Sequence, residues 1–105
     1  MVKVKVFQDG ELKEEYDGDY AVCIVSSRTE RKDVLRSKVS YAGNLPLKGI
    51  RAALADGAAR VLAVTSRRKG KSMEKACEVM AEFSADAVEA GAKAILDVYG
   101  GEEDD

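Results

Sequence analysis

The chain has 105 residues, a formal net charge of −2 and no histidine. This length provides for one domain with a single modest core. Histidine is the commonest general base and the commonest metal ligand, so its absence leads us to expect no metal site and no cofactor. No apolar run approaches the roughly 18 residues of a membrane span. The alternating residues 1–5 do not fit a secretory signal, and we expect neither a membrane segment nor a leader.

A hairpin is predicted at the start of the chain. Valines alternate with lysines over residues 2–7, which is the pattern of a half-buried strand. The Asp-Gly pair that follows indicates a tight turn. A two-residue loop would mix the apolar and charged faces, whereas a three-residue loop over 8–10 sets Val6 opposite Leu12. We therefore expect the three-residue loop, with Gly10 in a left-handed conformation.

Two further strands are predicted after this hairpin. A second turn over residues 17–19 precedes a near-continuous apolar run, Tyr20 to Val25, which predicts a central strand. The polar residues 26–33 predict a loop. Alternation over 34–42 then predicts a fourth strand at a sheet edge, where its lysine and arginine side chains would discourage further strand pairing.

Two helices are predicted in the second half of the chain. Asn44 is expected to cap the first, with Pro46 in its first turn and helical spacing through Thr65. Ser72 is expected to cap the second, which carries the clearest amphipathic pattern in the chain. The apolar stripe of this second helix comprises Met73, Cys77, Met80, Phe83, Ala87, Val88, Gly91, Ile95 and Val98.

Two architectures fit these elements. The first is an α+β fold, a four-stranded antiparallel sheet followed by two helices packed on one face. The second is a mixed α/β sheet with strands at 60–65 and 93–98, favoured by the similarity of residues 56–62 to residues 89–96. An unbroken polar stripe through Asp97 favours the first, and the second needs a long connection over 27–45. We expect the first, as a single domain over 1–99 with a disordered acidic tail over 100–105.

Charge is segregated along the chain. Residues 28–71 hold twelve basic residues against three acidic ones, whereas residues 72–105 carry a net charge of −8. Basic loops at 28–38 and 67–71 offer salt-sensitive phosphate contacts, so nucleic-acid or anion binding is one alternative function. The residues that would carry it are Arg28, Arg31, Lys32, Arg67, Arg68, Lys69 and Lys71.

An acidic surface is predicted on the second helix. Glu74, Glu78, Glu82 and Asp86 follow one another at intervals of four residues, which places them on one helix face. Like charges at this spacing cost a few tenths of a kcal/mol per pair. The stripe is therefore either a solvated face that tolerates this cost or a surface that attracts a basic partner.

A phosphate loop is a further alternative. Gly70, Lys71 and Ser72 precede the second helix and match the end of the motif Gly-x-x-x-x-Gly-Lys-Ser, but Thr65 stands where the first glycine belongs. An α/β nucleotide-binding or enzymatic domain would require this loop.

The remaining reactive side chains point to no catalytic site. Cys23 and Cys77 lie among apolar residues without a histidine partner, and we expect them to be buried free thiols in a reducing cytoplasm. No pair of carboxylates is set apart for acid–base chemistry, so we predict no catalytic residue.

The opening of the chain carries a resemblance. Its stretches Val2 to Leu12 and Glu15 to Val22 resemble small uncharacterised proteins of bacteriophages and integrated mobile elements. Those share a strand, an Asp-Gly or similar turn, a charged second strand and an apolar third, followed by helices. The resemblance implies an accessory protein that binds a host macromolecule, and it implies no catalytic residues. We therefore expect a small non-enzymatic cytoplasmic protein that binds a protein partner and forms a homodimer through its sheet edge or its helices.

Overall fold

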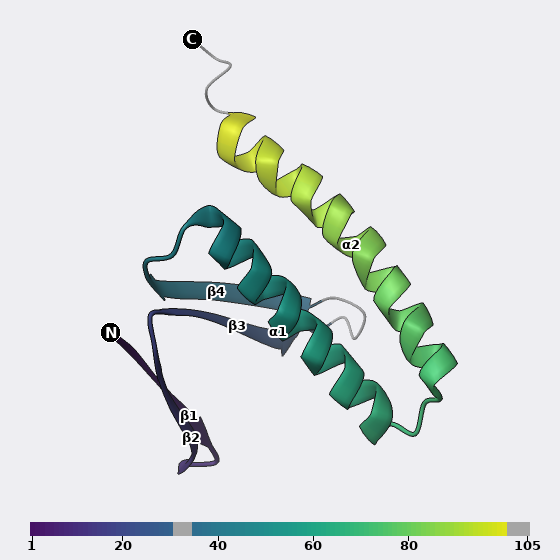
Figure 1. Ribbon diagram of the computed structural model, residues 1–105, viewed down its shortest axis with the longest axis horizontal. Helices are drawn as coiled ribbons and strands as arrows, with labels where there is room; N and C mark the ends of the chain where they lie inside the picture. The colour runs from purple at the N-terminus through teal and green to yellow at the C-terminus, as the bar shows by residue number, and fades with distance from the viewer. Residues whose placement is uncertain (31–34, 101–105) are drawn as a thin grey trace. The chain divides into compact units, whose positions relative to one another are not determined.

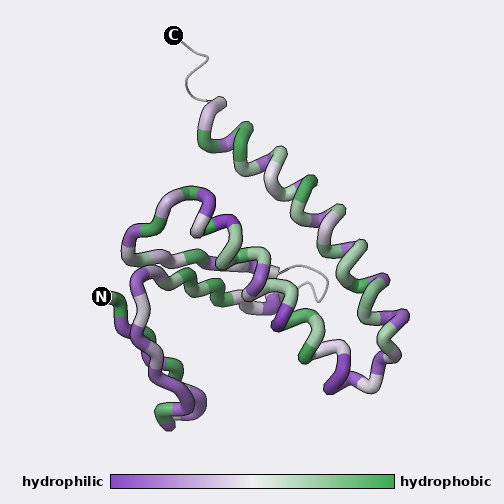
Figure 2. The backbone as a smooth tube through the Cα atoms, in the orientation of Figure 1, coloured by the Kyte–Doolittle hydropathy of each residue, from purple (hydrophilic) through white to green (hydrophobic). Residues whose placement is uncertain are grey.

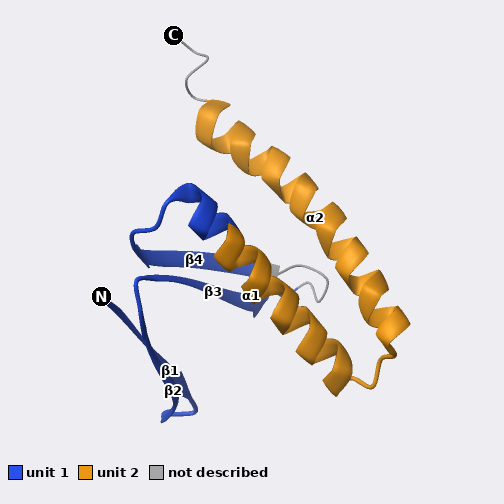
Figure 3. Ribbon diagram, in the orientation of Figure 1, with its two compact units in different colours: residues 1–51 blue, residues 52–105 orange. Residues whose placement is uncertain are grey.

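The computed structural model describes residues 1–30 and 35–100 and has the expected α+β composition (Figure 1). Four antiparallel strands come first and two helices follow, which confirms the predicted class and element order. The chain divides into two compact units, residues 1–51 and 52–105 (Figure 3). The elements are β1 (Val2–Gln8), β2 (Glu11–Gly18), β3 (Tyr20–Arg28), β4 (Leu35–Gly43), α1 (Leu47–Arg68) and α2 (Met73–Tyr99).

The strands form two separate two-stranded sheets, where we expected one sheet of four. β1 pairs with β2, and β3 pairs with β4. Each strand therefore pairs with its neighbour in sequence, because a short connection brings those two backbones together at the lowest cost in chain entropy. The packing of both helices on one sheet face stays a prediction.

The β1–β2 turn differs from the expected three-residue loop. Asp9 and Gly10 both have positive φ, 52° and 84°, which is the geometry of a two-residue hairpin loop. Val6 lies opposite Glu14 while Phe7 lies opposite Leu12, so the register shifts between these two pairs. The intervening Lys13 has no partner in β1. A two-residue loop without a bulge would mix apolar and charged residues on each face. The bulge at Lys13 shifts the register by one residue and so removes this objection.

The charged face of the β1–β2 hairpin is held by cross-strand ion pairs. Lys3 lies opposite Asp17, and its Nζ is 3.1 Å from a carboxylate oxygen of Glu15 and 4.0 Å from one of Asp17. The expected three-residue loop would instead set Lys3 directly opposite Glu15. The ion pair to Glu15 therefore forms, but along the diagonal of the ladder.

Tyr16 on β2 provides a pH-dependent prediction. A hydrogen bond with Glu14, followed by partial desolvation and the negative charge of Glu14, raises the pKa of the Tyr16 hydroxyl above its usual 10.0. Because the raised pKa favours the neutral phenol in the folded chain, this contact stabilises the fold below pH 10 and its contribution is lost as the pH rises through the raised value. Ultraviolet titration, taken as the difference between wild type and Tyr16→Phe, should give a midpoint above 10.

The matched variant for this titration is Glu14→Gln. It removes the negative charge beside the phenol, so the midpoint of Tyr16 should move down toward 10. An unchanged midpoint would show that Glu14 does not hold the hydroxyl.

The β3–β4 hairpin is longer than the sequence pattern indicated. β3 continues to Arg28, so residues 26–28, which we assigned to a loop, are strand. Ser26 lies opposite Ser37, and their hydroxyls share a hydrogen bond of 2.7 Å. This cross-strand hydrogen bond between side chains stabilises the strand pairing at these polar positions. Residues 29 and 30 lie outside the strand, as the predicted loop requires, and residues 31–33 of that loop lie outside the described residues.

A close backbone contact closes the open end of this hairpin. Gly43 has φ +96°, and the backbone N–H of Asn44 donates to the carbonyl oxygen of Asp19 at 3.3 Å. Gly43 also lies opposite Tyr20 in the ladder. The chain therefore turns from β4 toward α1 at a residue without a side chain.

The two helices run without a break through the segments that the alternative architecture made strands. Residues 60–65 lie within α1 and residues 93–98 within α2, so the mixed α/β alternative is wrong. Gly57 and Gly91 sit inside these helices, and a Cβ at either position would meet nothing within 4 Å. Helix geometry is thus maintained across both glycines at a cost of about 1 kcal/mol each relative to alanine.

The helix ends are only partly as predicted. Asn44 does not cap α1, because the helix begins at Leu47 and the carbonyl of Pro46 accepts from the N–H of Ile50 at 3.0 Å. At α2 the prediction is confirmed, since the Ser72 hydroxyl accepts from the N–H of Lys75 at 3.2 Å. The predicted acidic tail lies outside the described residues except for Gly100, which donates its N–H to the Leu96 carbonyl.

Ser72→Ala should therefore destabilise α2. The variant leaves the N–H of Lys75 without its side-chain acceptor, and an exposed cap of this kind is worth about 0.5–1 kcal/mol. Urea unfolding followed by circular dichroism at 222 nm measures the loss. Ser72→Asp is the control, because its carboxylate can accept the same bond and should retain most of the stability. Equal stability of wild type and Ser72→Ala would contradict the cap.

Apolar side chains are left largely uncovered. No apolar residue is buried among residues 1–30 and 36–100, and Ser66 is the one buried residue there. Cys23 and Cys77 are both exposed, so the expectation of buried thiols is wrong. Figure 2 shows hydrophobic and hydrophilic residues alternating along both helices and along the strands. The described strands and helices thus have the patterning of core-facing elements, and their apolar side chains stay open within each unit.

Candidate interaction surfaces

The turn between α1 and α2 gathers four cationic side chains. Arg67 and Arg68 end α1, Lys69 and Lys71 follow, and all four are exposed. The N–H of Gly70 donates to the Arg67 carbonyl and that of Lys71 to the Ser66 carbonyl, both at 3.0 Å. With Gly70 at φ +75°, these are the two bonds of a Schellman motif. The turn is therefore fixed by its backbone, and its cations are presented to solvent.

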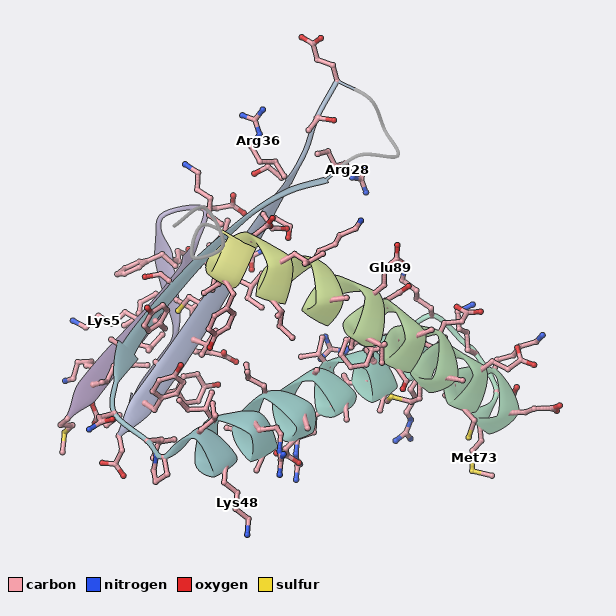
Figure 4. The ribbon with its side chains drawn as sticks, turned by 90° about the horizontal axis from the view of Figure 1, so that it is seen from above. Lys5, Arg28, Arg36, Lys48, Met73 and Glu89 are labelled. Atoms are coloured by element: carbon pink, nitrogen blue, oxygen red, sulfur yellow. The ribbon has the colours of Figure 1, made fainter. Side chains whose placement is uncertain are left out.

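The second predicted basic segment is not joined to this turn by the structure. Arg28 ends β3 and is exposed, but it belongs to the unit 1–51, while the turn belongs to the unit 52–105. Arg31 and Lys32 lie outside the described residues. Figure 4 shows Arg28 and Arg36 at the far end of the β3–β4 hairpin. A joint surface of both basic segments stays a prediction.

The phosphate-loop motif has a different structural role. A phosphate loop joins a strand to a helix, whereas Gly70 here follows α1. Gly70 ends one helix and Ser72 caps the next. The strand–loop–helix arrangement that the motif requires is not formed.

The acidic stripe lies on α2 as expected. Glu74, Glu78, Glu82 and Asp86 are all exposed on this helix. Lys75 relieves part of the repulsion, with its Nζ 3.2 Å from a carboxylate oxygen of Glu78. Glu89 continues the stripe and pairs with Lys93 at 3.8 Å. Figure 4 shows Glu89 and Met73 leaving the helix on different sides.

One face of the β3–β4 hairpin is apolar. In an antiparallel ladder, opposed residues share a face, so Val22 with Tyr41 and Ile24 with Val39 lie on the same side together with Tyr20. Ile24, Val39 and Tyr41 are 64%, 62% and 75% exposed, which leaves this face open within its own unit. The opposite face carries Arg36 and Lys38. We did not assign this surface a role from the sequence, although its signal, the apolar run of β3, was present.

Comparisons with protein-family models, curated proteins and solved structures found no match for the chain. Over residues 1–30 and 35–100, no group of three or more His, Cys, Asp or Glu side chains is placed to hold a metal ion. Within the same residues, neither helix combines the length and apolarity needed to cross a bilayer. The candidate surfaces are therefore the basic turn, the acidic stripe and the two apolar faces on α2 and on the β3–β4 hairpin.

Proposed function

We propose that the chain is a small non-enzymatic binding protein that acts in the cytoplasm by covering the surface of a protein partner. An origin in a phage or mobile element fits this function and rests on the resemblance of residues 2–22. The observation that carries the proposal is the open apolar surface, because large exposed apolar patches in proteins mark interaction sites.

The exposure of individual apolar side chains on the β3–β4 hairpin supports this proposal. Ile24, Val39 and Tyr41 are 64%, 62% and 75% exposed. Contacts that cover such side chains remove apolar surface from water and are therefore favourable.

The apolar face of the β3–β4 hairpin is the surface that we assign to the partner. Tyr20 and Tyr41 lie at one end of this face beside Val22, and Ile24 and Val39 continue it along the ladder. Tyrosine is enriched at protein interfaces, where its ring supplies contact area and its hydroxyl tolerates water. The face has no charged residue between Tyr20 and Ile24, so a protein surface of apolar character fits it.

Two neighbouring residues give a matched test. Ile24 and Val25 are 64% and 63% exposed but lie on opposite faces of the hairpin. The full chain, immobilised, is challenged with host lysate as wild type, Ile24→Asp and Val25→Asp. A protein retained by wild type and Val25→Asp but lost with Ile24→Asp is the expected result. The same retention by all three, or by none, would contradict the proposal.

Nucleic-acid binding is the second candidate, favoured by the four exposed cations at the α1–α2 turn. Anisotropy with short DNA and RNA at low and near-physiological salt tests it. Binding should weaken steeply with salt and be lost when Arg67, Arg68, Lys69 and Lys71 become alanine. No binding at low salt, where nonspecific attraction is strongest, would exclude this candidate.

A further inference from the structure

The open face of the β3–β4 hairpin continues beyond its apolar part. Side chains alternate between the two faces of a strand, and β3 pairs with β4 without a shift in register. Ser26 and Arg28 therefore lie on the same face as Ile24. The hydroxyl of Ser26 is hydrogen-bonded to that of Ser37, and Arg28 is exposed. Along this face, apolar side chains are followed by two hydroxyls and then by a cation.

The charged residues of β3 and β4 are all basic. They are Arg28, Arg36 and Lys38, and all three are exposed. Within residues 1–30 and 36–100, the ion pairs involve other cations. Arg36 and Lys38 lie on the opposite face of the hairpin. A partner that covers the face of Ile24 therefore meets one positive charge, at the Arg28 end.

The dimensions of this face fit a single helix. Two paired strands lie about 4.8 Å apart, so the face is about as wide as one helix with its side chains, roughly 10 Å. Tyr20 and Arg28 are the ends of β3, about 26 Å apart along the strand. A helix of about 17 residues spans that length. An extended segment would instead pair with the sheet edge through its backbone and leave the face open.

We propose that the protein partner places an acidic amphipathic helix on this face. Its apolar residues cover Val22, Ile24 and Val39, and an Asp or Glu farther along the same helix face pairs with Arg28. The C-terminal end of a helix is the negative end of its dipole, so that end lies at Arg28. This inference rests on the proposed function and names the chemistry of the partner. Arg28 then determines specificity, because it attracts an acidic helix and repels a basic one.

Two synthetic helical peptides of about 17 residues test this chemistry. The acidic peptide has leucines on one face of its N-terminal half, and glutamates continue that face in its C-terminal half. The basic peptide has lysines in place of the glutamates. Fluorescence anisotropy with the full chain at low salt should give about tenfold tighter binding of the acidic peptide, a preference that shrinks as salt is added. Equal affinities, or binding of neither peptide, would overturn the proposal.

Arg28 and Arg36 provide matched variants for this assay. Both are exposed cations at the same end of the hairpin, but they lie on opposite faces (Figure 4). Arg28→Glu should reverse the preference, so that the basic peptide binds more tightly, whereas Arg36→Glu should keep the preference for the acidic peptide. A reversed preference also shows that the variant is folded. The same change in both variants would mean that net charge decides, and would overturn the role of Arg28.

A neutral substitution at Ile24 separates this inference from the proposed function. Ile24→Asn removes an apolar contact without adding charge, so both peptides should bind about tenfold more weakly. Val25→Asn, on the opposite face, should leave both affinities unchanged. Unchanged affinities with Ile24→Asn would contradict this face as the binding surface, and with it the proposed function. A loss with Ile24→Asn but equal effects of Arg28→Glu and Arg36→Glu would overturn the acidic helix alone.

A second copy of the chain is the other occupant to be tested, because α2 itself carries acidic and apolar residues. Sedimentation equilibrium should give the same mass for wild type and for Ile24→Asn at the concentrations of the peptide assay. A two-chain mass for wild type that falls to one chain in Ile24→Asn would overturn the proposal, since two copies would then cover this face for each other.

Discussion

Gly43→Ala should lose about 2–4 kcal/mol of unfolding free energy, the largest effect that we expect from a single methyl group here. Gly43 has φ +96°, a conformation that L side chains rarely adopt. An added Cβ would overlap the carbonyl oxygen of Asp19 and lie 2.8 Å from the Cα of Tyr20. Both obstacles are backbone atoms, so no side-chain rotation relieves the clash. Urea unfolding followed by circular dichroism measures the loss.

Gly57→Ala is the control for this variant. Gly57 lies inside α1, and a Cβ there would meet nothing within 4 Å. The substitution should stabilise the chain by up to about 1 kcal/mol through helix propensity. Opposite signs for the two glycine substitutions are therefore expected. A Gly43→Ala protein as stable as wild type would show that the β4 end does not approach Asp19 this closely.

Gly70→Val should cost about 1–2 kcal/mol, because a β-branched residue is poorly tolerated at the φ of +75° that this position holds. The substitution strains the two backbone bonds that end α1, donated by Gly70 to Arg67 and by Lys71 to Ser66. Steric overlap does not contribute to this loss of stability, since a Cβ at Gly70 would meet nothing within 4 Å. Chemical denaturation of full-length protein checks the value.

Gly70→Asn separates backbone strain from other causes. Asparagine tolerates the left-handed conformation better than other residues with a side chain, so its cost should be clearly smaller than that of valine. Equal costs for the two substitutions would argue against a left-handed Gly70. The same comparison reports on the basic turn, because this glycine orients the cations on either side of it.

The helices were the elements that sequence reasoning predicted best. Ser72 was identified as the cap of α2, and the stripe from Met73 to Val98 carried the correct period. Long periodic segments contain many residues that agree, so local exceptions such as Gly91 do not change the outcome. The start of α1 was less well predicted, because Asn44 and Pro46 lie close together and several starting residues satisfy the same preferences.

Strand pairing was harder to predict. The four strands were located, but the β1–β2 register was wrong, since a bulge removes the penalty that we had assigned to the two-residue turn. Alternation within a strand identifies its faces and leaves open which edge meets which neighbour. The sequence therefore could not distinguish one four-stranded sheet, which we expected, from the two separate hairpins that formed.

The charged surfaces followed from the sequence, and the open apolar surfaces did not. Cations close together in sequence, such as Arg67 and Lys71, stay close together in a turn, and acids four apart share a helix face. Burial depends on contacts between distant segments. Cys23 and Cys77 have apolar neighbours in sequence and are exposed nevertheless. Apolar neighbours along the chain do not bury a residue unless another segment packs against it.

The bulge in the β1–β2 hairpin makes Lys13 dispensable to the ladder. Shortening β2 by this one residue would leave Val4 opposite Tyr16 and Phe7 opposite Leu12, with continuous pairing between them. The hairpin can therefore exist in two lengths with the same faces. Relatives of this chain that lack one residue after the turn would conserve the fold, and an alignment that placed the gap elsewhere would misassign the side chains between that gap and Lys13.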